Sequence, residues 1–208
     1  MRDYVSWHDA YDDPSSALSW RLSRVRHHIG LVLDARPGPV TAVSLCAGDG
    51  RDLIGVLSAR ADADRVGVTL VEIDPVLAAR AVAAAEGLRV SVLTRDAGDA
   101  STYAGIVPAD LVLMVGIFGN ISDADLENLI RAAPGFCRPG ATLLWSRGRD
   151  ADIGDRNETV RNWFGQAGFR EVAYEAREGG ERAAMGVVQY EGEAVELDAA
   201  RRLFTFVR

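Results

Sequence analysis

The sequence predicts a single α/β domain whose mostly parallel β-sheet is covered by helices on both faces. Three observations favour this fold class. Short β-rich runs alternate with helix-like segments along most of the chain. The run at 110–115 is mainly apolar, as expected for a strand that is buried on both faces. A glycine-rich turn follows the first β-rich run, and 208 residues are about what one such domain needs.

The predicted strands are short, and turn or helix signals separate them. They cover residues 40–45, 66–73, 89–93, 110–115, 141–146, 169–175 and 203–207, with 185–190 as a further candidate strand. Asp13-Pro14 and Asp74-Pro75 each combine an N-cap residue with a proline at the first helical position, and Ser122 begins a capping box. The predicted helices cover residues 14–36, 51–60, 75–86, 122–133 and 157–167.

The bulk properties exclude several classes of protein. The net charge of −7 argues against a nucleic-acid partner, which needs a basic surface. The longest apolar run, 111–118, is too short to cross a bilayer, and the first residues lack the apolar core of a signal peptide. Cys46 and Cys137 form neither a disulfide framework nor a metal motif. We therefore expect a cytoplasmic protein without a membrane or nucleic-acid partner.

Four strand ends carry the residues that suggest a ligand site, because parallel sheets bind ligands beyond the carboxyl ends of their strands. Glycines in the first turn let the backbone approach a ligand closely, and the next helix directs its free N–H groups toward it. Glu72, at the end of the second strand, has the spacing of a carboxylate that accepts both ribose hydroxyls. A carboxylate at Asp96 can accept a hydrogen bond from an adenine amine. The candidate ligand-binding residues are Cys46, Ala47, Gly48, Asp49, Gly50, Asp52, Glu72, Ile73, Asp96, Ala97 and Gly116.

Over residues 40–206 these strand ends resemble the class I S-adenosylmethionine-dependent methyltransferase family. The string 44–52 is also similar to a group of small actinobacterial proteins of this fold. The resemblance implies a Rossmann-like sheet of seven strands, closed by an antiparallel pair that 169–175 and 203–207 would form. It also implies that S-adenosyl-L-methionine is the cofactor. Ala47, Gly48 and Gly50 would then contact its methionine portion, Glu72 its ribose, and Asp96 and Ala97 its adenine.

The sequence departs from the family pattern in the first loop. Cys46 stands at the first glycine position, and Ser44 replaces an acidic residue that is common near the end of the first strand. Asp49 or Asp52 could take over the contact with the ammonium group of the cofactor. A nicotinamide dehydrogenase is disfavoured, because its fingerprint needs a third glycine where this chain has Leu53.

The N-terminal residues 1–36 are interpreted as a lid segment followed by a helix, ahead of the cofactor-binding domain at 37–208; together they form one compact domain. By analogy with this fold, Trp7, His8 and Tyr11 would line the acceptor pocket, although a surface arm anchored by aromatic residues explains them equally well. On the helix, His27 and His28 stand beside Arg24 and Arg26, which predicts a solvated basic face. Asn120, after the fourth strand, is either an acceptor-binding residue or a turn residue.

The acceptor itself is not encoded in a recognisable motif. Methyl transfer from a sulfonium requires mainly alignment, and a base only when the acceptor is protonated. His8, Tyr11 and Asn120 are the candidate catalytic residues. Arg147 and Arg149 would bind an acceptor carboxylate or belong to a charged loop.

The acidic run of Asp150, Asp152 and Asp155 suggests magnesium, but Gly116 occupies the position where such enzymes place an acid, which favours a metal-free site. The function predicted is methyl transfer from S-adenosyl-L-methionine to a small molecule, such as a natural product. The alternatives are a cofactor-binding regulatory or partner-interaction protein without turnover and a peptide or protein methyltransferase. The sequence predicts no oligomeric state.

Overall fold

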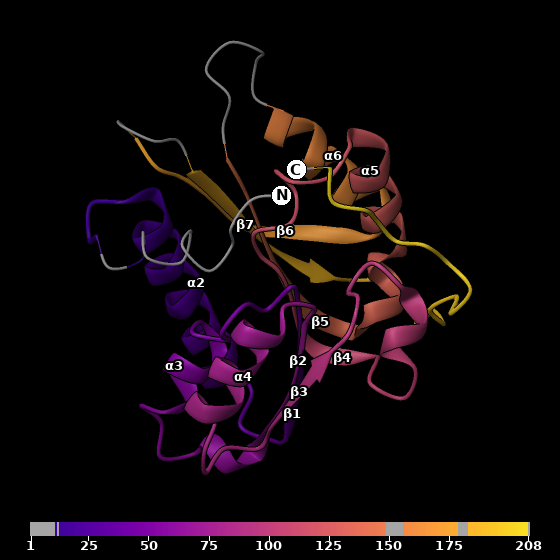
Figure 1. Ribbon diagram of the computed structural model, residues 1–208. Coiled ribbons are helices and arrows are strands. Elements are labelled where there is room, and N and C mark those ends of the chain that lie inside the picture. The colour runs from indigo at the N-terminus through magenta and orange to yellow at the C-terminus, as the bar shows by residue number, and fades with distance from the viewer. Residues whose placement is uncertain (1–10, 12, 149–155, 179–182, 208) are drawn as a thin grey trace.

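The computed structural model describes residue 11 and residues 13–148, 156–178 and 183–207, which form an α/β structure around one sheet (Figure 1). Within these residues the sheet has seven strands in the order β3-β2-β1-β4-β5-β7-β6. The strands are β1 (Val40–Leu45), β2 (Val66–Glu72), β3 (Val90–Thr94), β4 (Ala109–Met114), β5 (Cys137–Gly148), β6 (Phe169–Ala176) and β7 (Ala183–Tyr190). β1 to β5 are parallel, and β7 is antiparallel to both of its neighbours. The predicted fold class, with its antiparallel strand pair, is confirmed.

One member of the antiparallel pair was assigned wrongly. The pair consists of β6 and β7, and β7 corresponds to the candidate strand at 185–190, extended to begin at Ala183. β7 lies between β5 and β6, and almost all of its side chains are buried. The segment 203–207 instead makes only isolated bridges, between Asp99 and Arg202 and between Ile121 and Phe206. It is therefore not a strand of the sheet.

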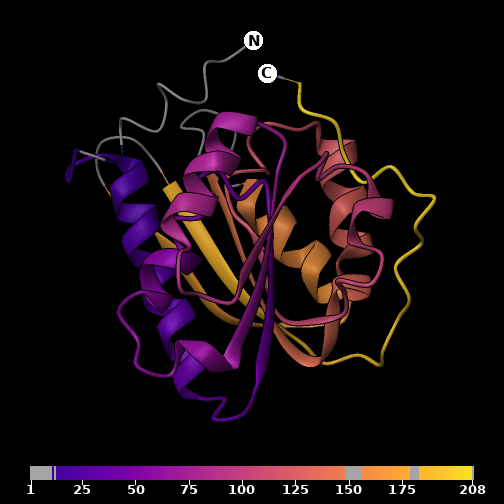
Figure 2. The same ribbon diagram turned by 60° about the horizontal axis from the view of Figure 1, so that its bottom comes forward.

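Helices cover both faces of the sheet (Figure 2). α2 (Ala17–Asp34), α3 (Leu53–Leu57) and α4 (Pro75–Ala84) share one apolar core with one face, and α5 (Asp123–Ala132) and α6 (Arg156–Gln166) share another with the opposite face. The predicted caps at Asp74 and Ser122 are confirmed. The predicted cap at Asp13 is wrong. Ser16 caps α2, while Asp13 accepts hydrogen bonds from Ser15 in the preceding turn.

α2 is tied to β6 by charged side chains, contrary to the predicted solvated basic face. His28 is buried and lies 2.7 Å from an Oε atom of Glu175, whose carboxylate also pairs with Arg24. A terminal nitrogen of Arg26 donates to the carbonyl oxygen of Arg51 at 2.6 Å. Helical periodicity alone did not show that this face meets a strand near the other end of the chain.

Because of Glu175, we expect the free energy of unfolding to depend on pH in the acidic range. Arg24, and less strongly His28, hold the pKa of Glu175 at about 2, below its usual value of 4.5. A lowered pKa in the folded state stabilises the fold above about pH 4.5, and this contribution is lost as the pH falls toward 2. We therefore expect Glu175→Gln to lower the melting temperature at neutral pH and to reduce its fall between these two pH values. Glu171→Gln, which removes an exposed pair with Arg161, is the control and should leave the acid dependence unchanged.

The segment after β7 returns across the α5 side of the molecule to the loop after β3 (yellow in Figure 1). The N–H of Leu203 donates to the carbonyl oxygen of Gly98 at 2.8 Å. The N–H of Ala100 donates to the carbonyl oxygen of Arg201 at 3.1 Å. Gly98 has no room for a side chain, because a Cβ there would lie 2.3 Å from the carbonyl oxygen of Phe204. This segment, residues 198–207, is called the C-terminal strap below.

None of the described helices is long and apolar enough to cross a membrane.

Candidate functional site

The loops after β1, β2, β3 and β4 meet at the carboxyl edge of the sheet, where the sequence placed the ligand site. The N–H of Ala47 donates to the carbonyl oxygen of Val71 at 2.9 Å, which keeps the first loop against the end of β2. β1 lies between β2 and β4, so its loop faces both neighbouring strand ends. The predicted residues therefore come from separate strands but occupy one edge.

The loop after β1 contains three residues in the left-handed backbone region: Cys46 at φ +52°, Gly48 at +59° and Gly50 at +69°. Cys46 thus adopts the conformation that a glycine would provide at the first position of the loop. Burial, and then the nearby carboxylates of Glu72 and Asp96, raise the pKa of the Cys46 thiol well above its usual value. The thiol is therefore uncharged at neutral pH. A non-glycine residue thus occupies a left-handed position at the start of this loop.

Glu72 connects the first two loops. Its side chain is buried, Oε2 accepts from the N–H of Gly48 at 2.7 Å, and Oε1 accepts from the N–H of Asp74 at 2.8 Å. A carboxylate can accept about four hydrogen bonds, so one held in this way can also bind ligand hydroxyls. The geometry fixes both the glycine-rich loop and the start of α4 relative to this acidic group.

Ile73, directly after Glu72, is 63% exposed. A large apolar side chain beside a buried carboxylate offers a flat ligand ring an apolar contact. Ala97, across the edge after β3, is buried, and its carbonyl oxygen accepts from the hydroxyl of Tyr103 at 2.8 Å. Ile73 is thus the exposed apolar residue of this part of the site.

Asp96 lies at the same edge but has a partner that the sequence did not reveal. Its Oδ1 accepts from the N–H of Gly98 at 2.8 Å, and its Oδ2 pairs with Arg202 of the C-terminal strap at 2.7 Å. Arg202 comes 106 residues later, and no local signal separates it from an ordinary surface arginine. The strap is therefore part of the wall beside the predicted adenine position.

Tyr11 lies over the loop after β1. The guanidinium of Arg51 stands 4.3 Å from the centre of the Tyr11 ring and pairs with Asp49 at 2.5 Å. Arg21, on α2, donates to the Tyr11 hydroxyl at 2.5 Å. Tyr11 thus contacts residues around the glycine-rich loop. Trp7 and His8 lie outside the described residues.

Arg21 also lies close to two other predicted site residues. A Cβ at Gly116, where φ is +80°, would lie 3.6 Å from a terminal nitrogen of Arg21. Burial raises the pKa of the Asp52 carboxyl, while the hydrogen bond from the N–H of Leu53 and the charge of Arg21 act in the opposite direction. Arg21 was missed because no local signal separates it from an ordinary surface arginine on its helix.

Asn120 braces the loop after β4. Its Nδ2 donates to the carbonyl oxygen of Gly116 at 2.8 Å, and its own carbonyl oxygen accepts from the N–H of Val207 at 2.9 Å. The N–H of Gly116 in turn donates to Oγ of Ser146 at 3.0 Å. The side-chain nitrogen of Asn120 thus shapes the loop, and its role toward an acceptor stays a prediction.

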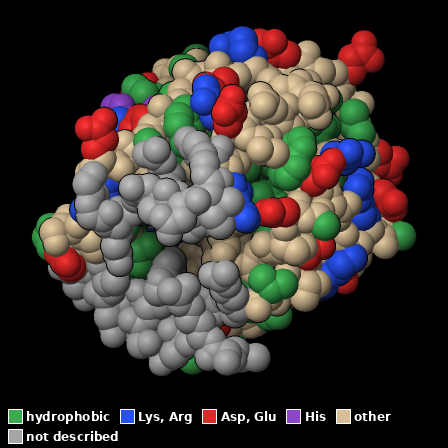
Figure 3. Space-filling view, turned by 90° about the horizontal axis from the view of Figure 1, so that it is seen from above, with side chains coloured by type: hydrophobic (Ala, Val, Ile, Leu, Met, Phe, Trp, Pro, Cys, Tyr) green, Lys and Arg blue, Asp and Glu red, His purple; other side chains and the backbone are tan. Residues whose placement is uncertain are grey.

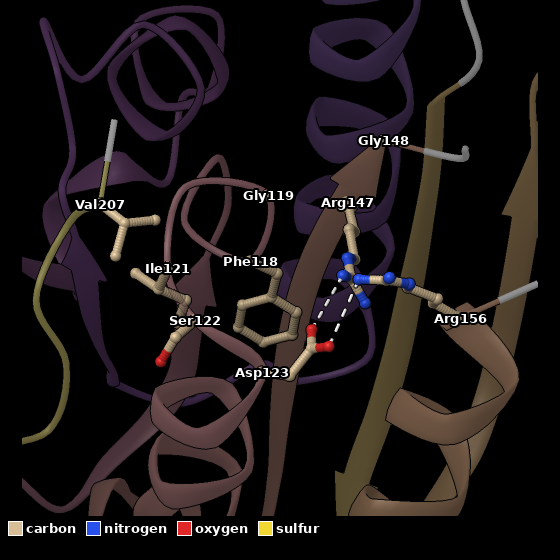
Figure 4. A pocket seen from close by; sticks show the side chains of 9 residues that line it. All are labelled: Phe118, Gly119, Ile121, Ser122, Asp123, Arg147, Gly148, Arg156 and Val207. Carbon is tan, nitrogen blue, oxygen red and sulfur yellow. Dashed lines mark hydrogen bonds and ion pairs between the residues drawn. The ribbon is translucent and has the colours of Figure 1, made fainter. Parts of the chain in front are cut away.

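A pocket of about 310 Å³ opens where the ends of β4 and β5 meet the starts of α5 and α6 (Figure 4). Apolar side chains of Phe118, Ile121 and Val207 lie on one side, and the guanidinium groups of Arg147 and Arg156 lie on the other. The remaining lining residues are Gly119, Ser122, Asp123 and Gly148. The predicted Arg147 is therefore at a pocket, whereas Arg149 falls outside the described residues.

Among the described residues, no cluster of three or more histidine, cysteine or acidic side chains could hold a metal ion. The acidic run of Asp150, Asp152 and Asp155 falls outside them. Gly116 follows β4, so this strand end has no acidic ligand at that position. The metal-free site stays a prediction.

Solved structures of other proteins support the fold, whereas sequence comparisons find no match. No protein-family model and no curated protein sequence matches the chain. The magnesium protoporphyrin IX methyltransferase ChlM from Synechocystis PCC 6803, solved with bound SAM, superposes with a TM-score of 0.70 over 90% of each chain at 12% identity. The 1,6-didemethyltoxoflavin-N1-methyltransferase of Burkholderia thailandensis, solved with its acceptor and S-adenosylhomocysteine, gives 0.66 at 15% identity, covering 91% of this chain and 84% of its own.

The same comparison finds a fold relative that is described by a different reaction. The [4+2]-cyclase SpnF superposes with a TM-score of 0.58 at 16% identity, covering 79% of this chain and 80% of its own. The chain therefore has the class I methyltransferase fold. Identities this low establish the fold, so the chemistry has to be argued from the site.

Proposed function

We propose that this protein is an S-adenosyl-L-methionine-dependent methyltransferase that acts on a small molecule. The observation that carries the proposal is the buried Glu72 at the end of β2, bound to the N–H of Gly48 in the glycine-rich loop. Many structural neighbours with this fold are methyltransferases, several solved with SAM or S-adenosylhomocysteine. The donors and acceptors at this edge fit the same cofactor part by part.

The fit can be stated residue by residue. Glu72 would accept from the two ribose hydroxyls, and the exposed Ile73 would pack against the adenine. Asp49 or Asp52, beside the glycine-rich loop, would accept from the ammonium of the methionine portion, while Arg21 provides a cation for its carboxylate. The N–H groups of Arg51 and Leu53 donate to the carboxylates of Asp49 and Asp52, at 3.3 and 2.8 Å, so these two N–H groups already have acceptors within the protein. Each polar part of the cofactor thus has a group of suitable charge.

When bound, the cofactor supplies a methyl group on a sulfonium, which is a good leaving group. The protein then has to hold the acceptor atom, the methyl carbon and the sulfur in line, which contributes about 7–11 kcal/mol. Gly116, without a side chain, keeps the end of β4 open for this approach. Tyr11 and Asn120 are the described candidates for contact with the acceptor, and His8 remains the third.

The test has two stages. Isothermal titration should show micromolar binding of both S-adenosylmethionine and S-adenosylhomocysteine. Incubation with labelled cofactor and pools of small molecules should then yield a labelled product of low mass. A folded protein that binds neither cofactor form would contradict the proposal.

A second candidate function is cofactor binding without methyl transfer. It is favoured by the cyclase that shares this fold and by the lack of an evident base among the described site residues. This candidate predicts tight cofactor binding with no methylated product from any acceptor pool. A labelled peptide or protein would instead indicate a macromolecular acceptor. On the face shown in Figure 3, the described acidic and basic side chains are intermixed and form no basic stripe of the kind that binds nucleic acid.

Ile73→Ala tests the adenine contact. The side chain is already exposed, so its removal should leave the free energy of unfolding nearly unchanged. If Ile73 packs on the adenine, affinity for S-adenosylmethionine should fall about tenfold, the loss expected for about 1.4 kcal/mol of apolar contact. Val82→Ala on α4 is the matched control, because Val82 is 59% exposed and its removal should not change affinity. Equal affinities in the two variants would place the adenine elsewhere.

A further inference from the structure

We propose that the pocket between the ends of β4 and β5 binds the methyl acceptor, and that this acceptor is a small organic anion. The inference rests on the proposed methyltransferase function and specifies its substrate class. It is carried by the arrangement of charge in the pocket, which no strand-end motif predicts.

The cationic side of the pocket is formed by two guanidinium groups from different elements. Arg147 comes from the end of β5 and Arg156 from the start of α6, and both reach Asp123 at 3.3 Å (Figure 4). Charge-assisted hydrogen bonds between nitrogen and oxygen are usually 2.7–2.9 Å long, so both contacts are stretched. In the part of the chain that the structure describes, Asp123 is the only carboxylate paired with either arginine. Two positive charges therefore share one negative charge.

Burial strengthens the positive character of this wall. The side chain of Arg147 is 11% exposed, whereas that of Asp123 is 59% exposed. Water screens the carboxylate more than it screens the guanidinium, so the inner part of the pocket carries the less compensated charge. An anionic group that enters the pocket can pair with Arg147 and Arg156, while Asp123 turns toward solvent.

The opposite side of the pocket offers little apolar surface. Phe118 is fully buried and stacks on Trp145 and Phe164, with ring centres 5.7 and 6.2 Å away, so it supports this side from behind. Ile121 is nearly buried, and Val207, at 60%, is the most exposed of the three apolar lining residues. A volume of about 310 Å³ is at the lower end of the range for small-molecule sites, so a compact molecule suits it.

The pocket also lies next to the proposed methyl-transfer position. Phe118 and Gly119 belong to the same short loop as Gly116, and Asn120 closes that loop by its hydrogen bond to the carbonyl oxygen of Gly116. Val207, at the end of the C-terminal strap, is held there by the carbonyl oxygen of Asn120. An acceptor in this pocket thus lies beside the end of β4.

An anion is favoured over a cationic or neutral acceptor by the chemistry of arginine. A guanidinium has donors only and keeps its charge at all working pH values, so it repels an amine and offers a carboxylate a planar fork of donors. Among the described lining residues, Asp123 is the one carboxylate, and it stands against the two guanidinium groups. The pocket therefore selects for a negative charge.

The test uses 2-naphthoate and its neutral isostere 2-naphthamide as probes, titrated by NMR into protein saturated with S-adenosylhomocysteine. We expect the acid to bind at least tenfold more tightly than the amide, as a charge-assisted hydrogen bond implies. Shifts should be largest at residues 118–123, 147–148 and 156. Equal binding of acid and amide, or no binding of the acid up to its solubility limit, would overturn the proposal.

Variants of the pocket residues identify the groups that bind the naphthoate. Arg147→Gln and Arg156→Gln should each weaken naphthoate binding about tenfold and leave naphthamide unchanged. Asp123→Asn removes the competing carboxylate and should strengthen naphthoate binding. Arg170→Gln, an exposed arginine paired with Glu191, is the control. Wild-type naphthoate affinity in Arg147→Gln would overturn the assignment.

The same samples separate this inference from the proposed function. S-adenosylmethionine affinity is measured on each variant and should not change, since these residues are not assigned to the cofactor. If the wild-type protein does not bind the cofactor, the methyltransferase proposal is refuted, whether or not the naphthoate and naphthamide probes bind. Normal cofactor binding with no preference for the acid would refute the anionic acceptor alone.

Discussion

Glu72→Ala is expected to cause the largest loss of cofactor binding of any single substitution in this protein. Removing the carboxylate deletes the proposed acceptor for two ribose hydroxyls, which should cost about 3 kcal/mol, or roughly a hundredfold in affinity for S-adenosylmethionine. It also leaves the N–H groups of Gly48 and Asp74 without their side-chain acceptor, so the free energy of unfolding should fall by about 2–4 kcal/mol. Calorimetry and urea denaturation measure the two effects separately.

Glu72→Gln distinguishes lost folding from lost recognition. The amide keeps one oxygen for a backbone N–H and preserves the volume, so this variant should stay folded and still bind poorly. Glu127→Ala, which removes an exposed pair with Arg131 on α5, should change neither quantity by much. Wild-type affinity in a folded Glu72→Ala protein would contradict the assignment of this site.

Gly50→Ala is expected to give the largest loss of stability from the smallest change in side chain. A Cβ at Gly50 would lie 2.6 Å from Cδ1 of Leu70 and 2.8 Å from Cδ1 of Ile54, and φ is +69°. The left-handed backbone and the contact with two core side chains together should lower the free energy of unfolding by about 2–4 kcal/mol. Thermal and urea denaturation should both show the loss.

Gly30→Ala provides the matched control on α2. A Cβ at Gly30 meets nothing within 4 Å, and the residue lies inside a helix. Alanine is favoured over glycine there, so this substitution should stabilise the protein by about 0.5–1 kcal/mol. A small effect of Gly50→Ala, similar to that of Gly30→Ala, would mean that the loop after β1 can move away from Leu70.

The parts of the fold that the sequence predicted correctly depend on local signals. Asp74 and Ser122 cap helices through neighbouring N–H groups, and Glu72 ends a strand that is buried next to β1. Parallel pairing then brings successive strand ends to one edge, so the residues around Glu72 could be grouped without knowing any distance. The fold class, and the grouping of these residues at one edge of the sheet, were predictable for this reason.

The incorrect assignments involve a choice between distant segments. The residues at 203–207 have a stronger β-rich composition than the start of β7, where small residues are common. Burial between β5 and β6 nevertheless makes Ala183–Tyr190 the strand. Arg21 and Arg202 were missed because each meets the site through tertiary packing, with Asp96 lying 106 residues before Arg202. Periodicity and propensity contain no information on such pairs.

The C-terminal strap can detach without breaking the sheet. Every described strand precedes residues 198–207, and the strap is joined to the loop after β3 by backbone hydrogen bonds of Ala100 and Leu203 and by the ion pair of Arg202 with Asp96. Because the strap lies outside the sheet, its local opening costs less free energy than global unfolding. We expect the amide hydrogens of Ala100 and Leu203 to exchange faster than those of β1 and β4.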